Sequence, residues 1–210
     1  MPSGSISHHA APTTAALGAT LRSLRGDPTL AYAVGSAAVV GAAWWLMLPL
    51  GMTLLLEARG ARDVKALASV LAAYGVGNLA ANLAVGNFTD RRPTSLLHGG
   101  RALTSVGFTL FALAPSQPLR MLAAAVAAAG GPLCDVGFIA LLQERFEGVR
   151  LAQVYRAVLA LSYGAMFGLF FASPWLFRAF GAQRVSLAAA LTIGLCGVTG
   201  LALARRPPSR

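Results

Sequence analysis

Charged residues are scarce in this sequence. Asp, Glu, Lys and Arg make up 11% of its 210 residues, whereas a typical soluble domain contains about 25%. Hydrophobic residues account for 56%, above the roughly 45–50% of soluble proteins. This is too little charge to cover a globular surface in water, which indicates that lipid surrounds much of the chain.

Residues for redox, metal or nucleophilic chemistry are also few, with two cysteines and three histidines. Cys134 and Cys196 lie inside apolar runs, which argues against a structural disulfide, and their spacing is not that of a zinc site. His8 and His9 lie in the polar first 28 residues, without an acidic cluster. The sequence contains no HExxH, GxSxG, Walker A or GxGxxG motif. We therefore expect no enzyme activity, no metal and no cofactor.

Basic residues exceed acidic ones by ten, a balance that can indicate nucleic-acid binding. Of the 17 basic residues all but Lys65 are arginines, and most lie in short gaps between long apolar runs. That distribution is typical of membrane-protein loops, so we expect a lipid bilayer and no nucleic acid as a partner. The composition, rich in Ala, Gly and Arg, is typical of a bacterial source, and the expected location is the bacterial cytoplasmic membrane.

Six apolar runs are each long enough to cross a membrane, since about 20 helical residues span its hydrocarbon core. Backbone groups in lipid must be satisfied within the segment, so each run should be a helix. The sequence predicts an all-α fold, a polytopic six-helix transmembrane bundle over residues 29–204. A polar cytosolic tail (residues 1–28) precedes it and a basic cytosolic tail (residues 205–210) follows. The expected spans are residues 30–56, 66–88, 96–115, 121–142, 157–177 and 185–204.

Lys and Arg are unequally divided between the two sides of such a bundle. Eleven of the 17 lie in the two tails and in the stretches that follow the second and fourth spans. The positive-inside rule places this side in the cytoplasm. Both termini are therefore expected to be cytoplasmic.

Asp135 is the only acidic residue well inside an expected span. An ionisable group at mid-membrane costs about 2.5 kcal/mol or more, which makes it a functional candidate. It follows Gly130-Gly131-Pro132, and because proline removes a helical hydrogen bond, the fourth helix should be bent or broken just before it. We interpret Asp135 as a proton or cation site, or as a contact to a cationic substrate. The alternative is a structural carboxylate that pairs with Arg101 or with a freed backbone group.

Polar side chains on the first two spans could extend this site. Tyr74, Asn78 and Asn82 are spaced four residues apart, so they share one helix face. On the first span Tyr32 and Ser36 lie one turn apart. These residues are candidates for a substrate or ion pathway. The asparagines could equally form hydrogen bonds that hold helices together.

Small residues, one proline and a tryptophan pair give further expectations. Gly77, flanked by Ala73 and Ala81 on its helix face, predicts close helix contact. Gly164 and Gly168 form a GxxxG pair, which predicts close approach within the chain or in a dimer. Pro49 with Gly51 should kink the first span. Trp44 and Trp45 lie near the centre of that span, where one could face a cavity or both could pack or contact lipid.

The turn between the second and third spans reads Gly86-Asn87-Phe88-Thr89-Asp90-Arg91-Arg92-Pro93. It resembles the cytoplasmic G-x-x-x-D-R signature of the major facilitator superfamily. Pro93 replaces the usual later glycine, and Thr94-Ser95 replaces a basic pair. This degeneracy resembles the copy of the signature in the second half of family members.

The resemblance implies a role in gating for this loop. Gly86 permits close packing at a helix end. Asp90 can accept N–H bonds at the start of the third helix and pair with a neighbouring arginine of the signature loop, Arg91 or Arg92, favouring one gate state. The alternative is a plain turn with solvated charges.

Family members contain twelve helices in two six-helix halves, and the resemblance covers residues 25–204. It implies a half-size unit that transports a small solute, of unknown identity, after pairing as a homodimer or with a second six-helix polypeptide. Two further stretches are similar to the C-terminal half of bacterial drug and siderophore exporters: Leu24-Arg25-Gly26-Asp27-Pro28, and Leu142-Gln143-Glu144 with Gly148-Val149-Arg150. The alternative is a truncated or helix-packing membrane protein that does not transport.

Overall fold

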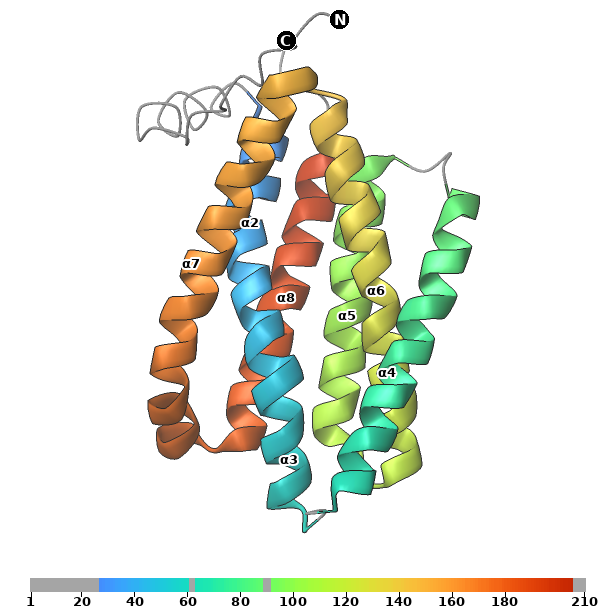
Figure 1. The fold of residues 1–210 in the computed structure, drawn as a ribbon, viewed down its shortest axis with the longest axis vertical. Helices are drawn as coiled ribbons and strands as arrows, with labels where there is room; N and C mark the ends of the chain where they lie inside the picture. Colours follow the sequence, from blue (N-terminus) through green and yellow to red (C-terminus); the bar gives the residue numbers. More distant parts are fainter. Residues whose placement is uncertain (1–26, 61–62, 89–91, 206–210) are drawn as a thin grey trace, which may run out of the picture.

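The computed structural model describes residues 27–60, 63–88 and 92–205. Every regular element in these ranges is a helix (Figure 1). In chain order they are α2 (Pro28–Trp45), the π-helical turn η1 (Leu46–Gly51), α3 (Met52–Ala58), α4 (Val64–Val85), the 3-10 turn η2 (Gly86–Phe88), α5 (Pro93–Leu113), α6 (Gln117–Gln143), α7 (Gly148–Phe180) and α8 (Ala182–Ala204). The expected all-α fold is confirmed for this part of the chain.

Five helical segments in the described ranges are long and apolar enough to cross a membrane: Pro28–Ala58, α4, α6, α7 and α8. This indicates a multi-pass membrane protein. The third expected span, residues 96–115, forms α5 but is not among the five. Its buried face carries polar residues, including His98 and Arg101, which lower its hydropathy. The sixth membrane crossing therefore stays a prediction.

The helices pack side by side in the order α4, α6, α5, α8, α2 and α7 (Figure 1). Helix α5 lies inside, between α6 and α8, while α4 and α7 lie at opposite edges. These edge helices are the least buried of the five apolar ones, with 11% and 17% of their most apolar stretch buried. Helix α2 begins and α8 ends at the same end of the bundle.

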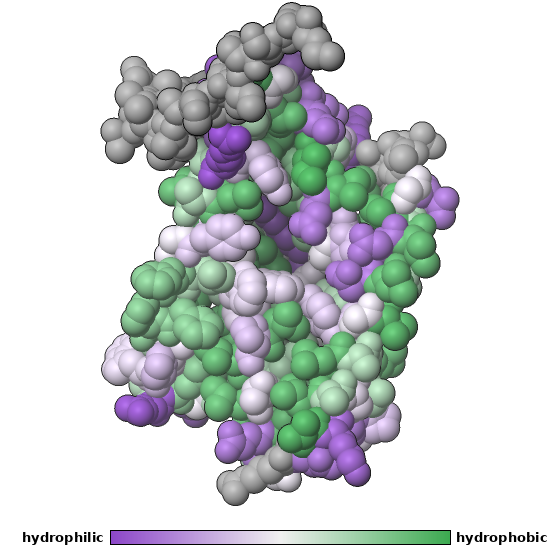
Figure 2. Space-filling model, viewed as in Figure 1, coloured by the Kyte–Doolittle hydropathy of each residue, from purple (hydrophilic) through white to green (hydrophobic). Residues whose placement is uncertain are grey.

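Two clusters of buried apolar side chains hold the bundle together. The larger packs the η1–α3 end of the first helical segment against α5, α6 and α8, around Met47, Phe108 and Ile193. The smaller lies at the opposite end and joins α2, α5, α6 and α7, around Leu30 and Leu142. Figure 2 shows hydrophilic residues gathered at the two ends of the molecule and hydrophobic ones over much of the face between them.

Prolines disturb two of the helices differently. In the first segment Pro49 lies in the π-helical turn η1, at the position where a kink was predicted. A π-helical turn accommodates a residue that cannot donate a backbone hydrogen bond. In α6 a bend or a break was predicted before Asp135. The break is wrong, because the helix continues through Pro132 to Gln143, and the bend stays a prediction. Dense packing of α6 against α5 on both sides of Pro132 holds the helix together.

Glycine makes that dense packing possible. A Cβ atom at Gly77 would overlap the backbone of Ala125, so α4 and α6 approach as closely as the small-residue pattern predicted. Within the described chain, nothing lies within 4 Å of a Cβ built at Gly164 or at Gly168. The GxxxG pair therefore makes no close contact inside this part of the chain, and contact in a dimer stays a prediction.

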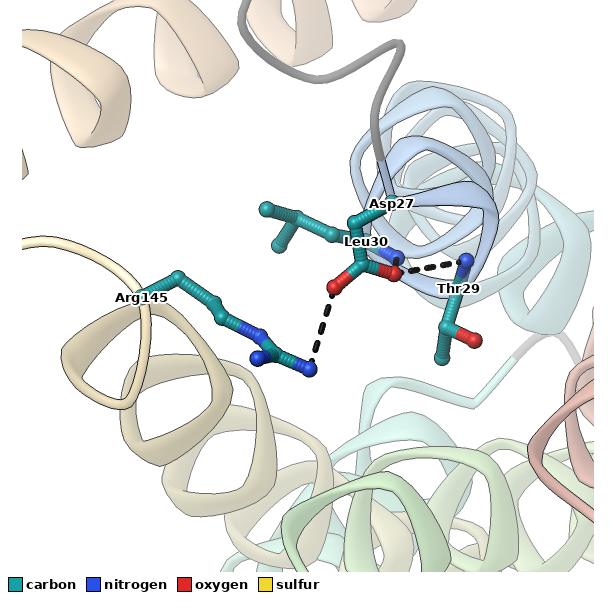
Figure 3. Close-up of polar contacts among 4 residues, drawn as sticks. All are labelled: Asp27, Thr29, Leu30 and Arg145. Carbon is teal, nitrogen blue, oxygen red and sulfur yellow. Dashed lines mark hydrogen bonds and ion pairs between the residues drawn. The ribbon is translucent and has the colours of Figure 1, made fainter. Parts of the chain in front are cut away.

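An N-cap and an ion pair fix the start of α2 (Figure 3). Asp27 Oδ1 accepts hydrogen bonds from the backbone N–H groups of Thr29 and Leu30 at 3.0 and 3.1 Å. Its other oxygen lies 3.1 Å from a guanidinium nitrogen of Arg145, in the turn between α6 and α7. A single carboxylate thus satisfies free helical donors and ties α2 to the end of α6.

Candidate solute or ion site

A cavity of about 470 Å³ lies between α2, α4, α5, α6 and α7, and Figure 2 shows a hollow on the face drawn there. All five helices line it with residues three or four positions apart, so each presents one face. The volume lies within the roughly 300–1,000 Å³ of small-molecule sites. The residues that line it include Trp44, Trp45, Tyr74, Asn78, Arg101, Gly131, Cys134, Asp135, Phe138, Tyr155 and Ser162.

Among the described residues, Asp135 is the only carboxylate that lines the cavity. It is exposed there, on the face of α6 that also carries Gly131, Cys134 and Phe138. It forms no hydrogen bond or ion pair with any residue in the described ranges, where Asp27–Arg145 is the one ion pair found. The described residues therefore do not support the alternative that Asp135 pairs with Arg101 in a structural role.

Aromatic side chains of α2 and α4 form one wall of the cavity. Trp44 donates an indole hydrogen bond to the hydroxyl of Tyr74 at 3.2 Å, and the two ring centroids are 6.4 Å apart. Trp45 packs edge-on against Trp44 at 5.4 Å. Both tryptophans line the cavity, so the first of the two alternatives, a tryptophan that faces a cavity, describes their position.

The asparagine stripe of α4 is only partly in the cavity. Asn78 lines it, and its amide nitrogen would lie 3.6 Å from a Cβ at Gly131. Asn82 is exposed and donates to the Asn78 side-chain oxygen at 2.9 Å. Asn82 therefore orients Asn78 without lining the cavity itself, and both asparagines bond along one helix instead of between helices.

Tyr32 and Ser36 belong to a separate buried cluster at the junction of α2, α5 and α8. Arg101, which is 2% exposed, donates to Ser36 Oγ at 2.7 Å and to the carbonyl of Ala33 at 3.3 Å. Its guanidinium lies 3.4 Å from His98 Nδ1. The Tyr32 hydroxyl donates to the carbonyl of Cys196 at 2.9 Å. Arg101 reaches the cavity edge, whereas Tyr32 and Ser36 do not line it.

The signature loop is described only in part. Gly86 begins the 3-10 turn η2 that follows α4. Arg92 is exposed and precedes Pro93, the first residue of α5. Asp90 and Arg91 lie outside the described residues, so the expected cap and ion pair of this loop stay predictions.

Three members of these sites were missed or undervalued in the sequence. His98 is fully buried. Its ring occupies the space that a Cβ atom would fill at Gly200, so the imidazole fits only because this residue of α8 is a glycine. Its spacing of three from Arg101 on a predicted span was the available signal. Tyr155 and Ser162 of α7 also line the cavity. Ser162 lies within the expected fifth span, whereas Tyr155 precedes it, because α7 begins at Gly148. In the described ranges no three His, Cys, Asp or Glu residues lie close enough to hold a metal ion.

No protein-family model matches the chain, and no curated protein matches it. The resemblance to the major facilitator superfamily thus stays a prediction that rests on the residues quoted for it.

Proposed function

We propose that this protein is a half-size membrane transporter unit, in which Asp135 binds a proton or the cationic group of a small solute. The observation that carries the proposal is the cavity of about 470 Å³, in which Asp135 is the only carboxylate among the described lining residues. A carboxylate without a protein partner in a largely apolar setting gains most when a cation or a proton neutralises it.

The walls of the cavity support a cationic ligand. Trp44, Trp45, Tyr74 and Tyr155 offer aromatic faces, and an organic cation is attracted to such faces within about 6 Å. The amide of Asn78 adds a hydrogen-bonding group. The Arg101 guanidinium donates its hydrogen bonds to Ser36 and Ala33 of α2 and not to Asp135.

Pairing is proposed because the cavity lies on one face of the bundle, flanked by its two least buried helices. Large apolar side chains are exposed on both flanks, among them Leu79 and Leu83 on α4 and Tyr163 and Phe171 on α7. A two-fold axis through the cavity face would set α4 of one copy against α7 of the other. Such a dimer encloses the cavity between two copies.

Disulfide cross-linking between two differently tagged variants tests the pairing. In a background with Cys134 and Cys196 replaced by serine, one variant carries Leu79→Cys on α4 and the other carries Tyr163→Cys on α7. Co-expressed in membranes, they should form a mixed dimer upon oxidation. Val198→Cys on α8, equally exposed, is the matched control and should not cross-link to either. Equal cross-linking of all three pairs would mean random collision and would refute this arrangement.

Transport is tested in vesicles by proton release upon addition of small organic cations, using an entrapped pH-sensitive dye. Asp135→Asn should abolish the coupled signal, since the amide keeps the shape and loses the charge. Asp63→Asn is the matched control, because Asp63 caps α4 through the N–H of Lys65 and lies outside the cavity. Equal rates of proton release for the wild type and for both variants would refute the role of Asp135. No proton release by the wild type would leave a non-transporting membrane protein as the better assignment.

A further inference from the structure

A second cavity of the bundle lies away from Asp135 and shares no lining residue with the first. It is an apolar groove of about 830 Å³ between α2, α7 and α8. Its walls are almost entirely aliphatic or aromatic, for example Val39, Leu169 and Leu176. Along α7 it runs from Ala165 to Phe180, which at 1.5 Å per residue is about 22 Å. Half of a hydrocarbon core measures about 15 Å, so the groove is long enough for an acyl chain of one leaflet.

The groove ends at a basic mouth, where α7 gives way to α8. Arg184 lines both the groove and an adjoining cavity of about 520 Å³ that also contains Arg59 and Gln183. Arg184 is exposed and has no hydrogen bond or ion pair to a described residue. Arg59 donates to the carbonyls of Ala112 and Ala114. No carboxylate in the described ranges lines either space.

The position of Arg184 on its helix is unfavourable without an anion. It is the third residue of α8, whose first turn contains no acidic residue and whose N-cap, Gly181, supplies no side-chain hydrogen bond. The free N–H groups of a helix start favour negative charge and disfavour a cation. An anion at this mouth would offset both the charge of Arg184 and the free helical donors.

We infer that the groove binds one anionic phospholipid, with an acyl chain between α7 and α8 and the phosphate at Arg184. The negative charge of the lipid phosphate complements the basic mouth. The depth in the membrane also fits, because the mouth lies at the end of a membrane-spanning helix, where lipid headgroups lie. Free phosphate would not need the groove. A second copy of this chain would need a surface that complements Arg184.

Native mass spectrometry of the purified, delipidated protein tests the inference by titration with phosphatidylglycerol and phosphatidylcholine. One phosphatidylglycerol should bind with clear preference. Arg184→Gln should weaken it about fivefold, the worth of one basic residue beside an anionic lipid. Arg178→Gln is the matched control, because Arg178 is exposed in the last turn of α7 and lines neither space. Equal losses in both variants would show unspecific charge attraction and overturn the site.

A second pair of variants tests the groove itself. Gly168 lines it, Gly164 does not, and a Cβ at either meets nothing within 4 Å. Because the Cβ position is open at both sites and leucine is a better helix former than glycine, we expect both variants to fold. Gly168→Leu should reduce binding of both lipids, whereas Gly164→Leu should not. Displacement of the lipid by inorganic phosphate would instead indicate a free-anion site. Loss of the α4–α7 cross-link in Gly168→Leu would indicate a second copy in the groove. Either result would overturn the lipid assignment.

Discussion

The bond between Arg101 and Ser36 makes the sharpest prediction about stability. Ser36 is 7% exposed, and its hydroxyl accepts from the almost fully buried guanidinium at 2.7 Å. Ser36→Ala would leave that charge with two longer contacts, to the carbonyl of Ala33 at 3.3 Å and to His98 Nδ1 at 3.4 Å. Because a hydrogen bond to a charged group contributes about 1.5–3 kcal/mol, we expect the free energy of unfolding to fall by that amount.

Ser173 supplies the matched control. It is 3% exposed and donates to the carbonyl of Phe170 at 2.7 Å, one turn earlier on its own helix. Ser173→Ala breaks a local, uncharged bond and should cost about 0.5–1.5 kcal/mol. Unfolding of the purified protein in mixed detergent micelles, followed by circular dichroism, measures both variants under one condition.

A double-mutant cycle separates the charge from the packing. Arg101→Met keeps much of the side-chain volume and removes a buried charge, a change that is often neutral or stabilising. In that background Ser36→Ala should cost less than about 1 kcal/mol, because no guanidinium is left without an acceptor. If Ser36→Ala costs the same with and without Arg101, or no more than Ser173→Ala, the reasoning is refuted.

Three further predictions concern the bundle. Asp27→Ala should lower the free energy of unfolding by about 1–2 kcal/mol through loss of the cap. Arg145→Gln should lower it by under about 1 kcal/mol, since Arg145 is 53% exposed and solvent screens the ion pair. Chemical unfolding compares the two variants. Gly77→Ala should cost about 1–3 kcal/mol by pushing α4 from α6, while Gly75→Ala, which meets nothing within 4 Å, should be neutral or stabilising; equal effects would argue against close contact. Tags at the two chain ends should both be modified from the cytoplasmic side only, and opposite labelling would break the six-span topology.

Much of the helical framework was predictable, because a long apolar run in lipid must form a helix to satisfy its backbone hydrogen bonds. The predicted spans differ from the helices mainly at the ends, most at α7, which begins at Gly148 instead of near residue 157. The first turns of α7 contain polar residues and precede the apolar run on which the prediction was based. The π-helical turn at Pro49 and the close contact at Gly77 also followed from residue type.

The arrangement of the site was less predictable, since it depends on which helices become neighbours. Asp135 and Asn78 line one cavity as grouped in the sequence, but Ser36 binds Arg101 in a different place. The spacing of residues showed which of them share one face of a helix. It could not show which other helix packs against that face. Pro132 shows the same limit, because packing against α5 keeps α6 continuous where the isolated sequence favours a break.

The mass of the particle extracted directly from membranes into native nanodiscs tests most directly whether this chain is half of a transporter. One chain weighs 21.6 kDa. The account predicts a protein mass of twice that value, or of one chain plus a second polypeptide of similar size. A particle that contains one chain and no partner, under extraction that keeps a known membrane dimer intact, would contradict the proposal of a cavity completed by pairing.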